Sequence, residues 1–141
     1  MIVDDQGYNI KALQVILASM KVDVDVVCAK AFNGQQAVDL VKSSLGHFKQ
    51  LQCGFSLILM DCNMPIKDGY QATEEIRVVC QDVEQPLIVA VTGHTEQVYI
   101  KKCETSGMNK VFSKPVDIVS LKKFLVDKQI ISITNEANGA D

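Results

Sequence analysis

Long apolar runs, a secretory leader and an excess of positive charge are all missing from this sequence of 141 residues. The longest apolar runs, such as 57–60 and 87–91, fall far short of the roughly 18 residues that a membrane-spanning helix needs. No basic segment followed by an apolar one opens the chain, so we expect neither a secretory signal nor a contact of this chain with a membrane. Lys and Arg total 14 against 17 Asp and Glu, and the resulting net charge of -3 disfavours binding to nucleic acid through phosphates.

Metal-binding and redox motifs built from cysteine or histidine are also missing. No two of the five cysteines have the spacing of a zinc knuckle or a redox pair, and His47 and His94 lie far apart. We therefore interpret the cysteines as reduced, mostly structural thiols of a cytoplasmic protein. There is no glycine-rich phosphate-binding loop, which disfavours a nucleotide-binding switch.

Short apolar runs alternate with amphipathic stretches along the whole chain. The runs predict strands at 2–3, 24–28, 55–60, 87–91 and 111–112. The stretches predict helices over 10–20 with Asn9 as N-cap, 37–41, 72–79, 98–107 and 118–125 with Asp117 near its start. This alternation predicts an α/β fold, a five-stranded parallel sheet with helices on both faces and an unusually short first strand.

One domain accounts for the length and composition, and no internal repeat is visible. We place the domain at residues 1–128 and a C-terminal tail at 129–141, whose last residues, 135–141, are polar and expected to fray. The segment 43–54 is the expected long loop.

Polar side chains follow four of the predicted strands. Asp4 and Asp5 follow the first strand, Asp61 follows the third, Thr92 the fourth and Lys114 the fifth. Ligands of open parallel sheets bind at the carboxyl ends of the strands, so we expect these five side chains to converge there. Each of them follows an apolar run, at a position where another apolar core residue would otherwise be expected.

Three converging carboxylates repel one another and favour either a bound proton or a divalent cation. Oxygen ligands of this kind suit Mg²⁺. A cation held there could neutralise a phosphoryl group on Asp61, because carboxylates can accept phosphoryl groups as aspartyl phosphates. The Thr92 hydroxyl, the Lys114 ammonium and nearby backbone N–H groups would stabilise the transferred group.

At this point the sequence resembles the receiver domain of two-component response regulators and hybrid histidine kinases. The matching segments are 3–5 (VDD), 31–37 (AFNGQQA), 57–65 (LILMDCNMP), 68–69 (DG), 91–94 (VTGH) and 112–115 (FSKP). No single segment is decisive, but together they stand in order, at receiver-like spacing, over about residues 2–126. The resemblance implies a flavodoxin-like (β/α)5 receiver fold and a phosphorelay function.

The resemblance assigns the phosphoacceptor and the metal ligands. Asp61 is expected to accept a phosphoryl group from a phosphohistidine of a histidine kinase or a histidine phosphotransfer protein. Asp5 is expected to bind Mg²⁺ directly and Asp4 to assist through water. Asn63 would offer its backbone carbonyl to the same ion, which Asp61 also binds.

The resemblance also assigns the residues around the phosphoryl group. Thr92 is expected to bind it and shift on phosphorylation, and Lys114 to pair with one of its oxygens. Pro115 is expected to follow a cis peptide bond, which X-Pro bonds adopt most cheaply. Gly93 leaves room for the phosphoryl group, and Gly69 suits a loop position with unusual backbone angles.

Three features depart from the family pattern. Only Met1, Ile2 and Val3 precede the aspartates, which suggests a chain cut from a longer protein or an incomplete gene model. Val111 stands where the family has its switch aromatic, and its neighbour Phe112 is expected to point into the core because side chains alternate along a strand. No output domain follows, which favours a receiver within a hybrid histidine kinase.

Two other readings stay open. The same fold could serve as a pseudo-receiver, an interaction module that is never phosphorylated, although the intact set of Asp4, Asp5, Asp61, Thr92 and Lys114 argues against it. A dehalogenase-like phosphatase also uses an aspartyl nucleophile, but it needs an aspartate where Asn63 stands. We expect a self-catalysed phosphoacceptor rather than a turnover enzyme.

Overall fold

Five parallel strands form one sheet in the order β2-β1-β3-β4-β5 in the computed structural model, which describes residues 1–46 and 51–133. The strands are β1 (Ile2–Val3), β2 (Lys30–Ala31), β3 (Leu57–Met60), β4 (Leu87–Thr92) and β5 (Lys110–Ser113). The predicted parallel sheet and its short first strand are confirmed. Ile58, Leu59 and Met60 of β3 are at most 1% exposed, as expected for a central strand covered on both faces.

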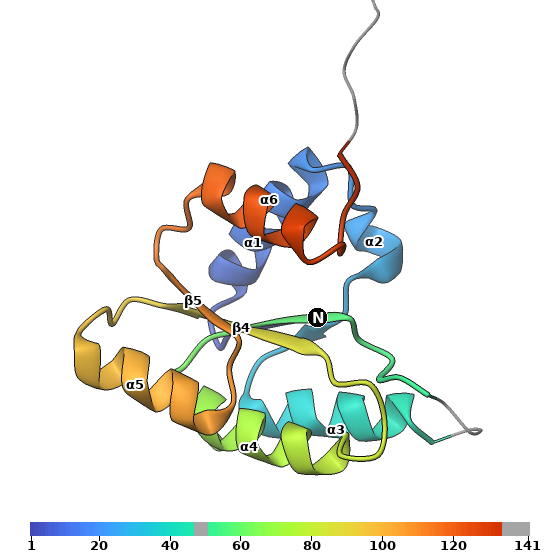
Figure 1. Ribbon diagram of the computed structural model, residues 1–141. Helices are drawn as coiled ribbons and strands as arrows, with labels where there is room; N and C mark the ends of the chain where they lie inside the picture. Colours follow the sequence, from blue (N-terminus) through green and yellow to red (C-terminus); the bar gives the residue numbers. More distant parts are fainter. Residues whose placement is uncertain (47–50, 134–141) are drawn as a thin grey trace, which may run out of the picture.

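Six helices in the described residues cover both faces of this sheet (Figure 1). They are α1 (Gly7–Ser19), α2 (Val24–Val27), α3 (Gly34–Ser44), α4 (Gly69–Val79), α5 (Gln97–Ser106) and α6 (Ile118–Asp127). Helices α1, α2 and α6 lie on one face, and α3, α4 and α5 lie on the other. None of the described helices is long and apolar enough to cross a membrane.

Each face has its own apolar core. Beneath α1 and α6 the buried side chains include Ile10, Leu13, Leu17, Leu121 and Leu125. Beneath α3, α4 and α5 they include Val38, Val41, Ala72, Ile76 and Cys103. Phe112 is 8% exposed and meets Phe124 edge-on with ring centroids 5.9 Å apart, so its predicted place in the core is confirmed.

Side-chain caps start three of the helices. Asn33 accepts a hydrogen bond from the Gln36 N–H at 2.9 Å at the start of α3, and Asp68 accepts one from Gln71 at 2.8 Å at the start of α4. Asp117 caps α6 in the same way, as expected from the sequence. These caps satisfy N–H groups that have no partner within the helix.

The predicted strand over 24–28 is wrong, because residues 24–27 form the short helix α2. The strand that pairs with β1 is Lys30–Ala31, in register with Ile2 and Val3. Since β1 has only two residues, no backbone lies opposite 24–28 to complete a ladder. Val26 is 77% exposed, so this valine-rich run does not pack as a buried strand.

Asn9 is not the N-cap of the first helix, which was a second wrong prediction. The cap is Gln6, whose carbonyl accepts hydrogen bonds from the Asn9 and Ile10 N–H groups at 3.0 and 3.3 Å. The helix thus begins at Gly7, before the apolar pattern starts, and the Asn9 side chain is turned towards Asp4.

The boundaries of the loop and tail are only partly described. Helix α3 ends at Ser44, so the expected long loop follows it, and residues 47–50 lie outside the described residues. The tail 135–141 also lies outside them. The division at residue 128 stays a prediction; Ile130 and Ile131, just beyond it, are half-buried against the core beneath α1 and α6.

Candidate functional site

Three carboxylates and one ammonium meet at the carboxyl edge of the sheet. One oxygen each from Asp4, Asp5 and Asp61 lies within 4.8 Å of the others. The Lys114 Nζ lies 2.9 Å from Asp4 Oδ2 and 3.4 Å from Asp61 Oδ1. The structure therefore brings together four of the residues that the sequence singled out, from the ends of β1, β3 and β5.

Thr92 lies at the same edge, but its hydroxyl is hydrogen-bonded to a backbone N–H and not to the carboxylates or Lys114. Its carbonyl accepts the Lys114 N–H at 2.8 Å, which ties the ends of β4 and β5 together. Its side chain is 1% exposed, and Oγ1 accepts the His94 N–H at 3.1 Å. The hydroxyl of Thr92 can still donate, because that bond uses only a lone pair.

The charges of the site do not balance. Burial raises the pKa of Asp61, the charges of Asp4 and Asp5 raise it further, and Lys114 opposes the shift. Burial acts against the Lys114 ammonium, but its contacts with Asp4 and Asp61 prevail and raise its pKa. One ammonium thus faces three carboxylates, and this excess of negative charge favours a cation.

The donor set fits Mg²⁺, and the two aspartates after β1 differ in what they offer. Asp4 is 2% exposed and accepts hydrogen bonds from the Gln6 N–H at 2.9 Å and the Asn9 amide at 3.3 Å, besides pairing with Lys114. Asp5 is half-buried and makes no hydrogen bond or ion pair with another described residue. Its carboxylate is the better placed to bind an ion directly.

The Asn9 amide is part of the site that the sequence reasoning missed. An asparagine five residues after an aspartate is common, and only the early start of α1 turns its side chain towards Asp4. Asn63 is exposed two residues after Asp61, and its backbone role stays a prediction.

Two glycines, Gly69 and Gly93, lie near Asp61 and Thr92, and only the first allows close backbone packing. A Cβ on Gly69 would lie 2.1 Å from the Asp61 carbonyl oxygen, and its N–H donates to the Cys62 carbonyl at 2.9 Å. Gly69 has no left-handed φ, so the prediction of unusual backbone angles there is wrong and close approach explains this glycine instead. A Cβ on Gly93 would meet nothing within 4 Å, so space is open beside Thr92.

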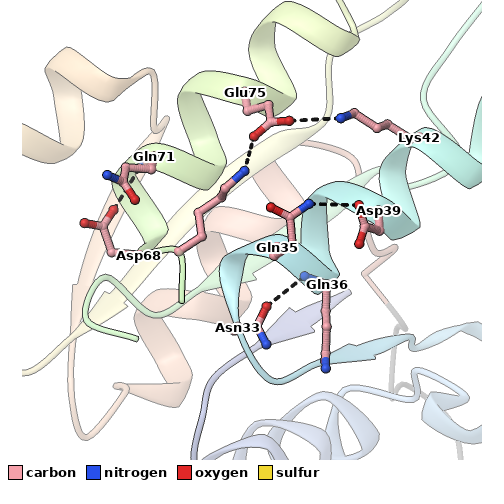
Figure 2. Close-up of polar contacts among 9 residues, drawn as sticks. Asn33, Gln35, Gln36, Asp39, Lys42, Asp68, Gln71 and Glu75 are labelled. Atoms are coloured by element: carbon pink, nitrogen blue, oxygen red, sulfur yellow. Dashed lines mark hydrogen bonds and ion pairs between the residues drawn. The ribbon is translucent and has the colours of Figure 1, made fainter. Parts of the chain in front are cut away.

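Two ion pairs that share Glu75 hold the loop after Asp61, and no local sequence pattern predicts them (Figure 2). Glu75 of α4 bonds to Lys67 in the loop and lies 2.9 Å from Lys42 of α3. The hydrogen bonds from these two lysines lower the pKa of Glu75. Lys42 and Glu75 are 33 residues apart, so the pairing follows from the packing of α3 against α4.

Two further expectations concern the neighbours of the site. The Lys114–Pro115 peptide bond is cis, as expected. All five cysteines are free in the structure, and their reduced state stays a prediction. Burial and the nearby Cys103, whose Sγ lies 3.7 Å away, raise the pKa of Cys62 to about 12, so this thiol next to Asp61 is a poor nucleophile.

Comparisons with known proteins agree with this geometry. The family model described as the response regulator receiver domain matches residues 1–126. Hybrid signal transduction histidine kinase B of Dictyostelium discoideum is 30% identical over 140 residues, which are 92% of this chain and 6% of that protein. This chain therefore spans only a small part of the curated relatives it matches.

Two solved structures of receivers have the same fold. The receiver domain of the histidine kinase CKI1 from Arabidopsis thaliana, complexed with Mg²⁺, is 28% identical with a TM-score of 0.73, over 92% of this chain and 88% of that one. A chain from the co-crystal structure of Saccharomyces cerevisiae Ypd1 and the receiver domain of Ssk1 is 27% identical with a TM-score of 0.75, over 95% and 91% of the two chains.

Proposed function

The chain belongs to the response regulator receiver domain family of two-component phosphorelays, and from this premise we propose that Asp61 accepts a phosphoryl group from a partner's phosphohistidine. The observation that carries the proposal is the position of Asp61 at the end of β3, beside the Lys114 ammonium and two further carboxylates. A carboxylate in a charge cluster of this kind can act as a nucleophile, provided that positive charge offsets the negative charge it acquires.

The transfer requires one bond to form and one to break. An Asp61 oxygen attacks phosphorus, the nitrogen–phosphorus bond of the donor breaks, and its electron pair stays on the histidine nitrogen. Lys114 is already 3.4 Å from Asp61 and offsets the charge on the phosphoryl oxygens. Thr92 can donate its hydroxyl hydrogen to one of these oxygens while Oγ1 keeps its bond from His94.

We propose Mg²⁺ as the cofactor, held by Asp5 and Asp61, by the Asn63 carbonyl, and by Asp4 through water. When bound, it supplies positive charge that offsets the carboxylates and the phosphoryl oxygens. The acidic cluster supports this assignment, as does the Mg²⁺ in the CKI1 receiver structure. Water later hydrolyses the acyl phosphate, so the chain catalyses its own phosphorylation and dephosphorylation without being a turnover enzyme.

The proposed donor is a histidine kinase or a histidine phosphotransfer protein, as the Ypd1–Ssk1 co-crystal structure suggests for a related receiver. Three of the similar proteins are hybrid signal transduction histidine kinases of Dictyostelium discoideum, and we propose that this chain is a receiver of such a kinase. A cytoplasmic location stays a prediction that the free thiols support. Phosphorylation is expected to alter the surface formed by α5, β5 and α6, because Thr92 and Lys114 lie at the ends of the neighbouring strands.

The test is intact-protein mass after incubation with acetyl phosphate, with and without Mg²⁺. We expect a Mg²⁺-dependent mass gain of one phosphoryl group in the wild-type chain and none in Asp61→Asn. Asp82→Asn is the matched control, because Asp82 is an exposed acid in the turn after α4. If the wild-type chain gains no mass with Mg²⁺, the phosphoacceptor proposal fails and the pseudo-receiver alternative replaces it.

A further inference from the structure

Ile66 has a backbone conformation that isoleucine rarely adopts. Its φ is 71°, and the Lys67 N–H donates to the Pro65 carbonyl at 2.8 Å. A hydrogen bond between residues two apart around a positive φ is the pattern of the rare, strained form of the γ-turn. A β-branched side chain makes the left-handed region still less favourable, and glycine or asparagine would fit there better.

The two other non-glycine residues with positive φ among those the structure describes have an ordinary explanation. Lys21 and Gln129 have φ values of 64° and 59°, and each follows the C-cap of a helix. A left-handed residue is the usual end of an α-helix. Ile66 follows no helix and has no such reason for its conformation.

Burial does not explain Ile66 either. Its side chain is 82% exposed, so the core gains nothing from an isoleucine at this strained position. An exposed apolar side chain in a strained backbone is retained only if the surrounding structure holds it there. The function of such a residue has to be sought outside the fold of the domain.

The surrounding structure does hold this loop from both sides. The Gly34 N–H donates to the Lys67 carbonyl at 2.9 Å, and a Cβ on Gly34 would lie 2.5 Å from that oxygen. The ion pairs of Glu75 with Lys67 and Lys42 hold the side chain of Lys67, the residue after Ile66. The Asp68 cap then starts α4 (Figure 2). The isoleucine is therefore presented to solvent by a loop that cannot easily relax.

We propose that Ile66 is an apolar contact for a histidine phosphotransfer protein, packing against apolar side chains around that protein's phosphohistidine. Ile66 lies five residues after Asp61, on the loop that leads from the acceptor to α4. A loop whose backbone is already held loses little conformational entropy on binding, which favours association. The proposal rests on Asp61 being the phosphoacceptor, and it adds a residue that selects protein donors over small ones.

The test compares two phosphodonors on the same variants, with phosphorylated Ypd1 as the protein donor and acetyl phosphate as the small one. For Ile66→Asn, we expect kcat/KM with Ypd1 to fall about tenfold, the factor expected when an apolar contact of this size is lost. The rate with acetyl phosphate should stay within about twofold, since a small donor needs no apolar contact. The urea midpoint of Ile66→Asn should rise, because asparagine tolerates the left-handed region.

Two further variants serve as controls. Ile66→Val keeps the apolar contact and should retain the wild-type rate with Ypd1. Val78→Asn removes a side chain that is 64% exposed near the far end of α4 and should change neither rate.

Three results would overturn the proposal while leaving Asp61 as the acceptor. The first is an Ile66→Asn variant that is more stable yet accepts phosphate from Ypd1 as fast as wild type. The second is an equal loss with both donors, which would mean that the loop only shapes the acceptor site. The third is a wild-type chain that reacts with acetyl phosphate but not with Ypd1. Failure of Asp61 itself would show differently, as no reaction with either donor.

Discussion

At the carboxyl edge of the sheet, the partly buried Lys114 ammonium contacts carboxylates. At the amino edge, the positive groups Arg77 and the Met1 ammonium contact neutral oxygens among the described residues. Lys114 contacts Asp4 and Asp61. At the other edge, Arg77 makes five hydrogen bonds, to the carbonyls of Pro86 and Gly107 and to the side-chain oxygens of Gln85 and Asn109. The Met1 ammonium donates to the Leu57 carbonyl at 2.8 Å.

The two edges therefore have different roles. Three carboxylates against one ammonium leave a charge that a ligand or a phosphoryl group can change, so the carboxyl edge is suited to switching. The Arg77 guanidinium makes five hydrogen bonds to four acceptors and needs no ligand, although burial lowers its pKa. The amino edge is suited to holding the ends of α4 and α5 and the starts of β4 and β5 together. Each of the changes below alters one edge and leaves the other intact.

The largest expected effect comes from removing the ammonium at the carboxyl edge. Lys114→Met should slow phosphorylation by acetyl phosphate about 100-fold, because the charge that develops on the phosphoryl oxygens loses a fixed partner. Without Mg²⁺ it should also lower the free energy of unfolding by about 3 kcal/mol, because the buried Asp4 loses its ion-pair partner. Mass spectrometry and urea unfolding in EDTA measure the two effects.

The double variant Asp4→Asn with Lys114→Met is the control for stability. It removes a carboxylate together with the ammonium, so it should regain most of the lost stability but none of the lost rate. A Lys114→Met variant that is as stable as wild type would contradict the charge imbalance at the carboxyl edge.

Gly69→Ala tests the close packing behind Asp61. The added Cβ would lie 2.1 Å from a backbone oxygen, and backbone atoms cannot move away as a flexible side chain can. We expect a loss of about 3 kcal/mol in the free energy of unfolding, at the upper end for overpacking. Gly7→Ala is the matched control, because Gly7 also begins a helix at this edge and its Cβ would meet nothing within 4 Å. Similar midpoints for the two variants in urea unfolding would contradict the prediction.

Arg77→Lys tests the amino edge with the positive charge kept. A lysine ammonium lacks the planar fork of a guanidinium and cannot reach four acceptors, so the carbonyls of the half-buried Gly107 and the buried Pro86 lose partners. We expect a loss of about 2 kcal/mol in the free energy of unfolding. Phosphorylation by acetyl phosphate below the unfolding transition should keep its wild-type rate. A variant that remains stable but is phosphorylated slowly would show that the two edges are coupled.

The sequence predicted the carboxyl edge far better than the amino edge, and the reason is geometric. Asp4, Asp61 and Lys114 each follow an apolar run, and parallel strands bring such positions together whatever the details of packing. The partners of Arg77 lie 8 to 32 residues away on separate loops, and only the packed structure defines those contacts.

One wrong prediction and one feature that the sequence could not reveal also depend on the packed structure. The run 24–28 has the composition of a strand, but the two-residue β1 gives it no partner, so tertiary context overrides propensity. The φ of Ile66 is visible only in the coordinates, since isoleucine is an unfavourable residue for that conformation.

The smallest effect concerns the Met1 ammonium, next to an apolar cavity of about 300 Å³ that Leu17, Phe55 and Leu125 help to line. Burial lowers the pKa of this amine from its ordinary value near 8. At pH values between the lowered pKa and 8, the unfolded chain binds more protons than the folded chain. The free energy of unfolding therefore rises with pH through this window and levels off above pH 8.

Acetylating Met1 separates this effect from every other titration. The acetylated nitrogen carries no charge, yet its N–H can still donate to the Leu57 carbonyl, so the burial cost disappears and the hydrogen bond stays. Urea unfolding between pH 6 and 9 should show two curves that differ most at pH 6 and converge above pH 8, with the acetylated chain the more stable. Parallel curves would mean that the amine is hydrated at this edge, and the contrast with the carboxyl edge would then rest on Arg77 alone.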